Sequence, residues 1–224
     1  MNAPPDPPDD GPRHLFIVTY GRSGSTLLLG VLNSIPGYLI RGENDGAAYF
    51  LHQFHAAATH RKRRLRKRFE LPLDTTNPHF GLDDFPGKVS LRILRRLVTE
   101  TLLRPEPDTR VTGFKEIRWY QEDVPAYVEF LRQLFPDARF VINTRDHEAV
   151  LNSGWWPEKP RDGRLERMES AILDVADSLG DAAYRVHFDD YTADPTALRG
   201  LFEWLGEQFD ETRVRGVLGV RHSV

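Results

Sequence analysis

Hydrophobic positions along the chain follow two patterns: short runs of consecutive apolar residues, and longer segments in which they recur every three or four positions. Four short runs, rich in β-branched and aromatic residues, predict strands. They lie at 15–18, 110–115, 138–143 and 184–188. Helix-length segments separate them, and this alternation favours a single α/β layer sandwich with a mostly parallel sheet.

The longer segments predict helices. They cover 27–32, 47–68, 90–103, 124–135, 146–153, 164–179 and 194–205. Asp146 and Asp194 occupy N-cap positions, and Pro195 follows Asp194 in the first turn, where its missing N–H breaks no helical hydrogen bond. Residues 70–88 contain several Pro, Asp and Gly and predict an irregular loop.

The N-terminal end differs in composition from the rest of the chain. Residues 1–12 contain five Pro and three Asp, and predict a disordered tail before a single domain at 13–224. No apolar run approaches the roughly 20 residues of a membrane-spanning helix, so no membrane span is expected. The acidic, Pro-rich start is unlike a secretory signal peptide. These features predict a cytoplasmic protein, and they leave its oligomeric state open.

Thirty Lys and Arg against 33 Asp and Glu give a net charge of −3, so no nucleic-acid partner is expected. One basic run, from His60 to Arg68, nevertheless has seven Lys or Arg in nine positions. We interpret this run as a solvated helix face, while binding of a polyanionic acceptor, an acidic membrane or nucleic acid stays open. The lack of Cys excludes disulfides and thiolate metal sites, and we predict no metal site.

Candidate chemistry begins at the turn Gly21-Arg22-Ser23-Gly24-Ser25-Thr26, which lies between the first strand and the first helix. Backbone N–H groups and the helix dipole gather anions at such a junction. The two glycines allow the backbone to approach a ligand closely, the three hydroxyls add donors, and Arg22 adds a guanidinium suited to phosphate or sulfate. We predict an anion-binding turn; an ordinary turn of small residues is the weaker alternative.

Two familiar motifs do not fit this turn. A Walker A motif with Gly24 as its second Gly would need Lys at position 25, which is Ser, so nucleotide hydrolysis is disfavoured. A nucleophile elbow around Ser23 would need Gly at the same position. A nucleotide-dependent phosphotransferase of the kinase kind is the alternative function, with Thr26 available for Mg²⁺. A non-catalytic basic adaptor is a third hypothesis.

The segment from Phe16 to Leu28 resembles the 5′-phosphosulfate loop of sulfotransferases that use 3′-phosphoadenosine-5′-phosphosulfate (PAPS). It is nearer to the "PRSGTT" variety of tyrosylprotein and bacterial carbohydrate sulfotransferases, and departs from it at Gly21 and Ser25. The resemblance implies a P-loop-like three-layer sandwich with a central mostly parallel sheet. It also implies sulfuryl transfer from PAPS to a hydroxyl of a small-molecule or carbohydrate acceptor, with release of 3′,5′-adenosine bisphosphate and without a metal.

A second block resembles the 3′-phosphate motif of the same family. Arg145 follows the strand at 138–143, and Ser153 lies eight residues later. The resemblance implies that Arg145 holds the 3′-phosphate and that the Ser153 hydroxyl adds a donor. A third block, from Tyr184 to Pro195, resembles a late strand–loop–helix of the family, with Phe188 where Tyr is common.

The general base is assigned to Glu43, which follows the first helix. Its position 21 residues after Arg22 matches a Glu that acts as base in sulfotransferases with the Arg-type loop. A carboxylate acts best as a base near neutral pH when burial raises its pKa. Asp45 is the near alternative, and His79 and His52 are weaker ones.

Lys115, at the end of a predicted strand, is the candidate cation near the bridging oxygen of the donor, because related enzymes have a Lys in this region. A structural ion pair between Lys115 and a Glu is the alternative, and Arg22 would share the catalytic role. Trp155 and Trp156 either wall the acceptor pocket or merely pack. The basic residues Arg221 and His222 are not assigned to the site.

Overall fold

A computed structural model describes residues 11–220, so Arg221, His222 and all but the last two residues of the expected tail lie outside it. Within this part of the chain the sheet has five parallel strands in the order β2-β3-β1-β4-β5. The strands are β1 (Arg13–Val18), β2 (Tyr38–Arg41), β3 (Val111–Glu116), β4 (Arg139–Thr144) and β5 (Ala183–His187). The predicted α/β class with a parallel sheet is confirmed.

Nine α-helices in the described residues connect and cover these strands. They are α1 (Ser25–Asn33), α2 (Ala47–Arg68), α3 (Gly87–Val98), α4 (Val124–Leu134), α5 (His147–Leu151), α6 (Arg164–Leu179), α7 (Phe188–Ala193), α8 (Arg199–Leu205) and α9 (Glu211–Leu218). Shorter helical turns are η1 (Thr99–Leu103), η2 (Trp156–Glu158), η3 (Gly180–Ala182) and η4 (Pro195–Leu198). As predicted, the Asp146 side chain caps α5 by accepting a hydrogen bond from the Ala149 N–H.

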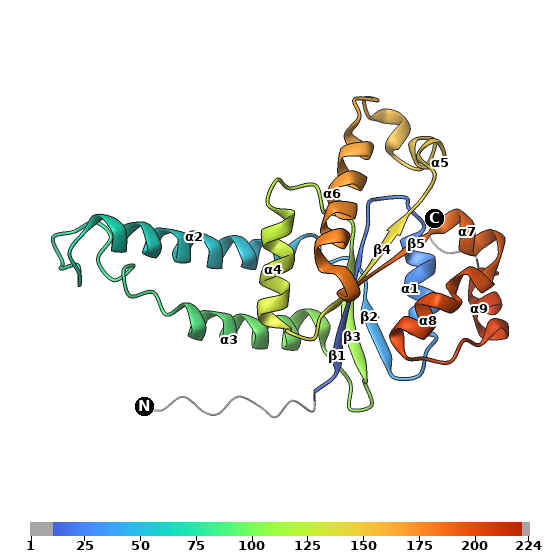
Figure 1. Cartoon of the computed structure of the whole chain (residues 1–224), viewed down its shortest axis with the longest axis horizontal. Coiled ribbons are helices and arrows are strands. Elements are labelled where there is room, and N and C mark those ends of the chain that lie inside the picture. The colour runs from blue at the N-terminus through green and yellow to red at the C-terminus, as the bar shows by residue number, and fades with distance from the viewer. Residues whose placement is uncertain (1–10, 221–224) are drawn as a thin grey trace.

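The sheet has a hydrophobic core on each face, because successive side chains of a strand point to opposite sides. Phe16 and Val18 of β1 belong to the core shared with α4 and α6, whereas Leu15 and Ile17 belong to the core shared with α1 and α8. In Figure 1, α1, α8 and α9 lie to the right of the sheet and α4 and α6 toward its left. The three-layer arrangement is therefore confirmed.

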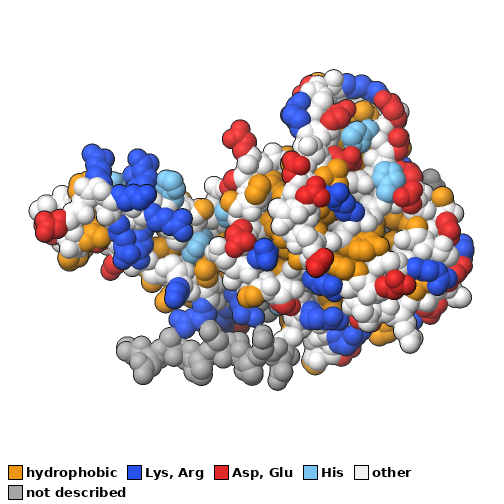
Figure 2. All heavy atoms as spheres, in the orientation of Figure 1, with side chains coloured by type: hydrophobic (Ala, Val, Ile, Leu, Met, Phe, Trp, Pro, Cys, Tyr) orange, Lys and Arg blue, Asp and Glu red, His pale blue; other side chains and the backbone are white. Residues whose placement is uncertain are grey.

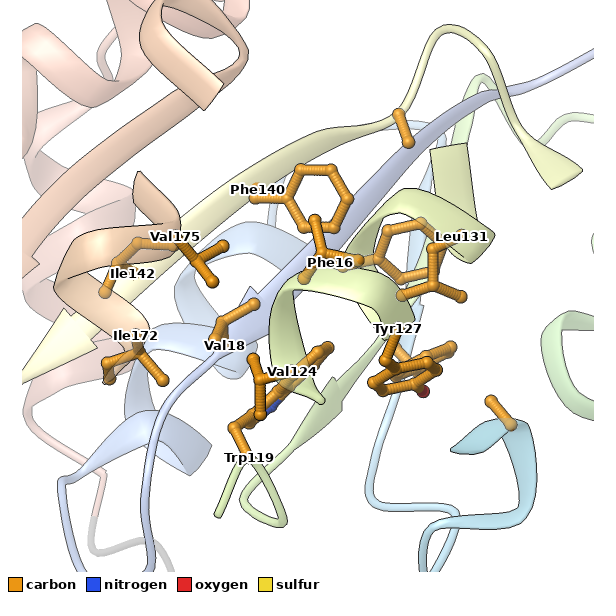
Figure 3. Packing of buried hydrophobic residues seen from close by; sticks show 14 of the residues in the cluster. Phe16, Val18, Trp119, Val124, Tyr127, Leu131, Phe140, Ile142, Ile172 and Val175 are labelled. Carbon is orange, nitrogen blue, oxygen red and sulfur yellow. The ribbon is translucent and has the colours of Figure 1, made fainter. Parts of the chain in front are cut away.

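Aromatic rings fill the core between the sheet and α4. The Phe16 ring lies 5.6 Å from that of Phe140 on β4 and 4.7 Å from that of Phe114 on β3. Figure 3 shows Phe16 and Phe140 facing Leu131 of α4, with Tyr127 close by. This packing holds β1 at the centre of the sheet and fixes the direction in which the chain leaves it.

Four elements differ from the expectations. The strand β2 was not predicted because it has only four residues and lies at the edge of the sheet. Helices α7 and α9 were not predicted either; both are short, at six and eight residues. The last predicted helix is divided into a 3₁₀ turn, capped by Asp194 through the Thr196 N–H, and the separate helix α8.

The helices α2 and α3 and their irregular connection project from the body of the molecule, to the left in Figure 1. We call residues 47–98 the arm. At its base, Asp123 accepts hydrogen bonds from the hydroxyl of Tyr49 at 2.7 Å and the amide of Gln53 at 2.7 Å, and its other contact is His52 Nε2 at 3.0 Å. Asp123 immediately precedes α4, so these bonds attach the arm to the body.

Candidate functional site

The turn after β1 forms one corner of a pocket. Arg22 and Gly24 both adopt the left-handed backbone region, with φ of 68° and 76°. Gly24 has this conformation without strain, and a Cβ at that position would overlap the ring of Phe188. Helix α1 starts at Ser25, so the N–H groups of its first turn, which have no partner within the helix, lie at this corner. Such a corner suits an anion.

Buried polar side chains support the turn from below. The Thr19 hydroxyl donates to the Asn143 carbonyl at 2.7 Å and lies 2.6 Å from the Ser23 hydroxyl. The Asn143 side-chain amide donates to the Ser23 carbonyl at 2.9 Å, and its oxygen accepts from Tyr191 at 3.0 Å. Ser23 belongs to the turn but is fully buried, and it does not line the pocket.

The junction of β4 and α5 supplies the second corner. Arg145 Nη1 donates to the Arg22 carbonyl at 2.9 Å, and the Arg22 Nε donates to the Ser153 hydroxyl at 3.0 Å. The guanidinium of Arg145 lies over the Phe188 ring, 4.5 Å from its centroid. Its Nε is buried and has no hydrogen-bond partner among residues 11–220. The two motifs found in the sequence therefore meet, and Arg145 keeps a buried donor unused.

Tyr20 holds the backbone of Arg145 in place. Its hydroxyl lies 2.5 Å from Glu169 Oε2, to which it donates, and accepts a hydrogen bond from the Arg145 N–H at 2.9 Å. Burial, together with the hydrogen bond to Glu169, raises the pKa of the Tyr20 phenol. The phenol therefore stays neutral and keeps both hydrogen bonds at ordinary pH.

Glu43 and Lys115 contact each other at the edge of the same pocket. Lys115 Nζ on β3 lies 2.5 Å from Glu43 Oε1, and the Lys115 side chain is 5% exposed against 34% for Glu43. A second cation, Arg118, lies 3.5 Å from Glu43 Oε2. The ion pair considered as an alternative for Lys115 thus joins the two candidate catalytic residues. Glu43 is less buried than a base of the expected kind.

The other candidate bases lie outside this pocket. The Asp45 side chain is 88% exposed and pairs with Arg118 at 2.6 Å. His52 is buried in the arm against Asp123, and His79 belongs to the connection between α2 and α3. Glu43 is the carboxylate that lines the pocket.

The pocket has a volume of about 380 Å³. It is lined by Gly21, Arg22, Gly24, Ser25, Thr26, Leu27, Glu43, Lys115, Ile117, Arg145, Trp155, Phe188 and Val220. Its lining includes three cations, Arg22, Lys115 and Arg145, and one carboxylate, Glu43, so its electrostatic potential favours an anion. Ser23 and Ser153 are the two predicted site residues that do not line it; the Ser153 hydroxyl accepts a hydrogen bond from Arg22 of the turn, and the Ser23 carbonyl accepts one from Asn143.

Two tryptophans separate this pocket from a larger cavity. The Trp156 indole donates to the Gly21 carbonyl at 2.9 Å, and its ring stacks on Trp155 at 4.7 Å. The neighbouring cavity, of about 740 Å³, shares Gly21, Ile117 and Trp155 with the pocket. Trp155 therefore lines both spaces, whereas Trp156 lines the larger cavity and packs against Trp155.

Several supporting residues gave no signal in the sequence. Asn143 was part of a predicted strand, and its role depends on Ser23, which is 120 residues away along the chain. Tyr191 contributes through Asn143, and Glu169 contributes through Tyr20. Only their polar character inside or beside apolar segments could have marked them.

The described residues lack the features of two other kinds of site. Residues 11–220 bring together no group of three or more His, Cys, Asp or Glu side chains that could hold a metal ion. None of the helices in this part of the chain has the length and apolar character needed to span a membrane.

Comparison with known proteins was made for the sequence and for the fold. A model of the sulfotransferase family matches residues 12–211. No curated protein sequence matches the chain. Among solved structures, the sulfotransferase domain from the Synechococcus PCC 7002 olefin synthase is similar, with a TM-score of 0.56 and 20% identity, covering 92% of this chain and 78% of that chain.

The sulfotransferase domain from the curacin biosynthetic pathway is also similar, with a TM-score of 0.52 and 14% identity, covering 91% of this chain and 77% of that chain. At these identities the two structures establish a shared fold, whereas the match to the family model establishes membership of the family. Because that match spans residues 12–211, nearly the whole described chain, this protein belongs to the sulfotransferase family and is a sulfotransferase enzyme.

Proposed function

We propose that this sulfotransferase moves a sulfuryl group from PAPS to a hydroxyl of a small-molecule or carbohydrate acceptor and releases 3′,5′-adenosine bisphosphate. The observation that carries the proposal is the meeting of two strand-to-helix corners in one cationic pocket. Arg145 of the second corner donates to the Arg22 carbonyl of the first, at 2.9 Å. A ligand with an anionic group at each end of a nucleotide suits this arrangement.

The residues present fit such a donor. The turn from Gly21 to Thr26 and the first turn of α1 would hold the 5′-phosphosulfate, since their N–H groups and Arg22 offer donors to oxygen anions. Arg145 would hold the 3′-phosphate, because its buried Nε lacks a partner in the described chain. The Ser153 hydroxyl accepts from Arg22 and still has its own proton to donate.

PAPS supplies an activated sulfuryl group whose leaving group is a phosphate. Glu43 would accept the proton of the acceptor hydroxyl on its carboxylate as the new S–O bond forms and the bond between sulfur and the bridging phosphate oxygen breaks, with 3′,5′-adenosine bisphosphate as the leaving group. Lys115 and Arg22 place positive charge beside the oxygen on which negative charge develops. Lys115 also contacts Glu43, with 2.5 Å between Nζ and Oε1. The same ammonium group would therefore orient the proposed base and stabilise the negative charge of the leaving group.

The acceptor enters through the larger cavity, which borders the pocket at Gly21, Ile117 and Trp155. Aromatic and apolar side chains, among them Trp155 and Met168, line this cavity together with the cations Arg118, Arg164 and Arg167, so it offers both apolar surface and positive charge to an acceptor. Its volume of about 740 Å³ is in the range of small-molecule sites. We further propose that residues 13–224 form one domain that carries this whole reaction.

The test compares thermal unfolding of the protein with 3′,5′-adenosine bisphosphate and with ATP–Mg²⁺. A ligand at 100 times its Kd adds about 2.7 kcal/mol of stability, so the bisphosphate is expected to raise the Tm measurably. Incubation with PAPS and a panel of hydroxyl acceptors, read by mass spectrometry, identifies the acceptor. Stabilisation by ATP–Mg²⁺ alone would instead support the phosphotransferase alternative.

A pair of variants connects this shift to the second corner. Arg145→Ala is expected to weaken bisphosphate binding by about 2–3 kcal/mol, because a charged hydrogen-bonding partner of the phosphate is lost. Arg139→Ala, at the opposite end of β4, where the guanidinium stacks over Trp204, is expected to keep the wild-type affinity. Equal affinities in the two variants would remove Arg145 from the nucleotide site.

A further inference from the structure

The arm carries most of the exposed apolar side chains of the described chain. Eight of the eleven large hydrophobic residues that are exposed within residues 11–220 belong to it. They are Phe50, Phe54, Phe69, Leu71, Phe80, Val89, Ile93 and Leu97. Single exposed hydrophobic residues are ordinary, whereas their concentration in one projecting element marks an interaction surface.

The arm also differs from the body in charge. Residues 47–98 contain eleven Lys and Arg and four Asp and Glu, a net charge of +7, whereas the rest of the chain has a net charge of −10. Figure 2 shows Lys and Arg side chains gathered over the outer half of α2. The overall charge of −3 hides this separation.

The cations of the arm are free of ion pairs, with one exception. Among residues 11–220, only Arg96 of the arm forms an ion pair, with Glu100 at 2.7 Å. Lys62 donates to the Phe85 carbonyl at 2.7 Å, and Arg68 lies over the ring of Phe69 at 5.3 Å. In the body, most described Lys and Arg are paired with carboxylates. Positive charge on the arm is therefore available to an outside partner.

Apolar and basic residues of α2 share one helix face. Residues three or four positions apart lie on the same side of a helix. Phe50, Phe54, Arg61, Arg64 and Arg68 follow this spacing with one step of seven, so the face is aromatic near the body and basic near the outer end.

The helix α3 repeats the combination. Val89, Ile93 and Leu97 form an exposed stripe at steps of four, and Arg92 and Arg96 form the stripe beside it. Apolar residues flanked by Arg and Lys are typical of helices that lie at a membrane surface.

We propose that the arm docks on an anionic lipid surface. Its Lys and Arg contact the negative headgroups, and Phe69, Leu71 and Phe80 at the outer end enter the boundary between headgroups and acyl chains. The outer end is the part of the molecule farthest from the sheet along its long axis, so it can reach a flat surface before the acidic body does (Figure 1).

Two other partners explain less of the surface. A nucleic-acid backbone would satisfy the cations but would leave eight large hydrophobic side chains in water. An acidic protein would need a groove shaped to a projecting arm whose apolar residues lie on two helices and on their connection. A lipid surface accepts both kinds of side chain without a matching shape.

The test is flotation of the full chain with vesicles of phosphatidylcholine alone and of phosphatidylcholine with 30% phosphatidylserine, at about 0.15 M salt. We expect binding to the vesicles with phosphatidylserine and none to the neutral vesicles. The triple variant Arg61→Glu, Arg64→Glu and Arg68→Glu is expected to lower the affinity at least about 100-fold, since each removed cation near the surface costs severalfold.

A matched variant changes the net charge equally on the body. Arg132→Glu, Lys159→Glu and Arg199→Glu, all exposed, are expected to leave vesicle binding within about threefold of wild type. If the body variant loses as much affinity as the arm variant, or if the wild-type protein does not bind the anionic vesicles, the proposal is wrong. The second result would leave an acidic protein as the partner to seek.

The apolar contribution is tested by Phe69→Ser with Phe80→Ser, and by Phe80→Ser alone. Phe80 is 58% exposed, so the single variant is expected to fold with the wild-type Tm. We expect the double variant to bind anionic vesicles about tenfold more weakly and the single variant to lose part of that. Unchanged vesicle binding, with equal binding of wild type and variants to a single-stranded oligonucleotide, would show a general polyanion surface and overturn the lipid assignment.

Discussion

Gly24 lies where the chain leaves β1 and enters α1, with a positive φ of 76° and no room for a side chain beside Phe188. Gly24→Ala is expected to lower the free energy of unfolding by about 2–4 kcal/mol, because the new Cβ is strained in this backbone region and overlaps the ring. It should also abolish bisphosphate binding. Urea unfolding and ligand titration measure both effects.

Gly216→Ala is the matched control for this change. Gly216 lies within α9, and a Cβ there would contact nothing within 4 Å. Alanine in a helix is favoured over glycine, so this variant is expected to be as stable as wild type or more stable by up to about 1 kcal/mol. Equal stability of the two variants would contradict the geometry of the turn.

Glu43 is the carboxylate that lines the pocket, next to Lys115. Glu43→Gln is expected to reduce turnover with the identified acceptor by roughly 10²–10⁴-fold, because the proposed base is lost, while bisphosphate binding is retained. Asp45→Asn is expected to keep turnover close to wild type, because its side chain points to solvent and pairs with Arg118. A fully active Glu43→Gln enzyme would assign the base to another residue.

At the residue scale, local motifs predicted the groups that line the pocket, whereas contacts between residues far apart in the sequence could not be predicted. The turn from Gly21 to Thr26 was predictable because anion binding by a strand–turn–helix depends on neighbours in sequence. The pairing of Lys115 with Glu43 joins residues 72 positions apart. The role of Asn143 could not be predicted for the same reason, because its partner Ser23 lies in the turn after a different strand, β1.

At the element scale, strands with long apolar runs were predictable and β2 was not. β4 is buried at its four central positions on both faces, and three of these form the continuous apolar run Phe140-Val141-Ile142. β2 is a four-residue edge strand, partly buried at alternate positions, and four residues carry too little periodicity to stand out. Glu43 follows the end of β2, and its assignment rests on its spacing from Arg22 and not on a predicted strand.

The attachment of the arm to α4 gives a prediction on stability. Partial burial opposes the charged form of Asp123, but hydrogen bonds from Tyr49 and His52 outweigh it and hold the pKa of this carboxyl below its usual value. Asp123→Ala is expected to cost about 1–3 kcal/mol and to lower the Tm by several degrees. Glu122→Ala, next to it but without a hydrogen bond in the described residues, is expected to change the Tm little.

The pH dependence of this attachment has a defined sign. Because the pKa of Asp123 is lower in the folded protein, its contribution is present above the unfolded value of about 4 and is lost as the pH falls through the folded value. Burial, and then the hydrogen bond to Asp123, raise the pKa of Tyr49 to about 12, so the contribution of the phenol is lost as the pH rises through about 12. The Tm difference between wild type and Asp123→Ala should therefore shrink below about pH 4.

At the scale of the whole molecule, the strand order assembles the site. β1 lies between β3 and β4, so Lys115, Arg22 and Arg145 reach one pocket from three adjacent strand ends. Ligands of open α/β sheets bind at these carboxyl ends. The sequence predicted the class of fold from its alternating segments, whereas the order of strands depends on pairings between residues about 43–124 positions apart and could not be predicted from the sequence.

The position of the arm in the chain allows its sequence to change independently of the pocket. The arm lies between β2 and β3 in the chain. None of its residues lines the pocket. Its outer turns can thus lengthen, shorten or exchange charge while the pocket keeps its shape. Enzymes with the same transfer reaction can in this way be directed to different surfaces by a change in the length or charge of the arm alone.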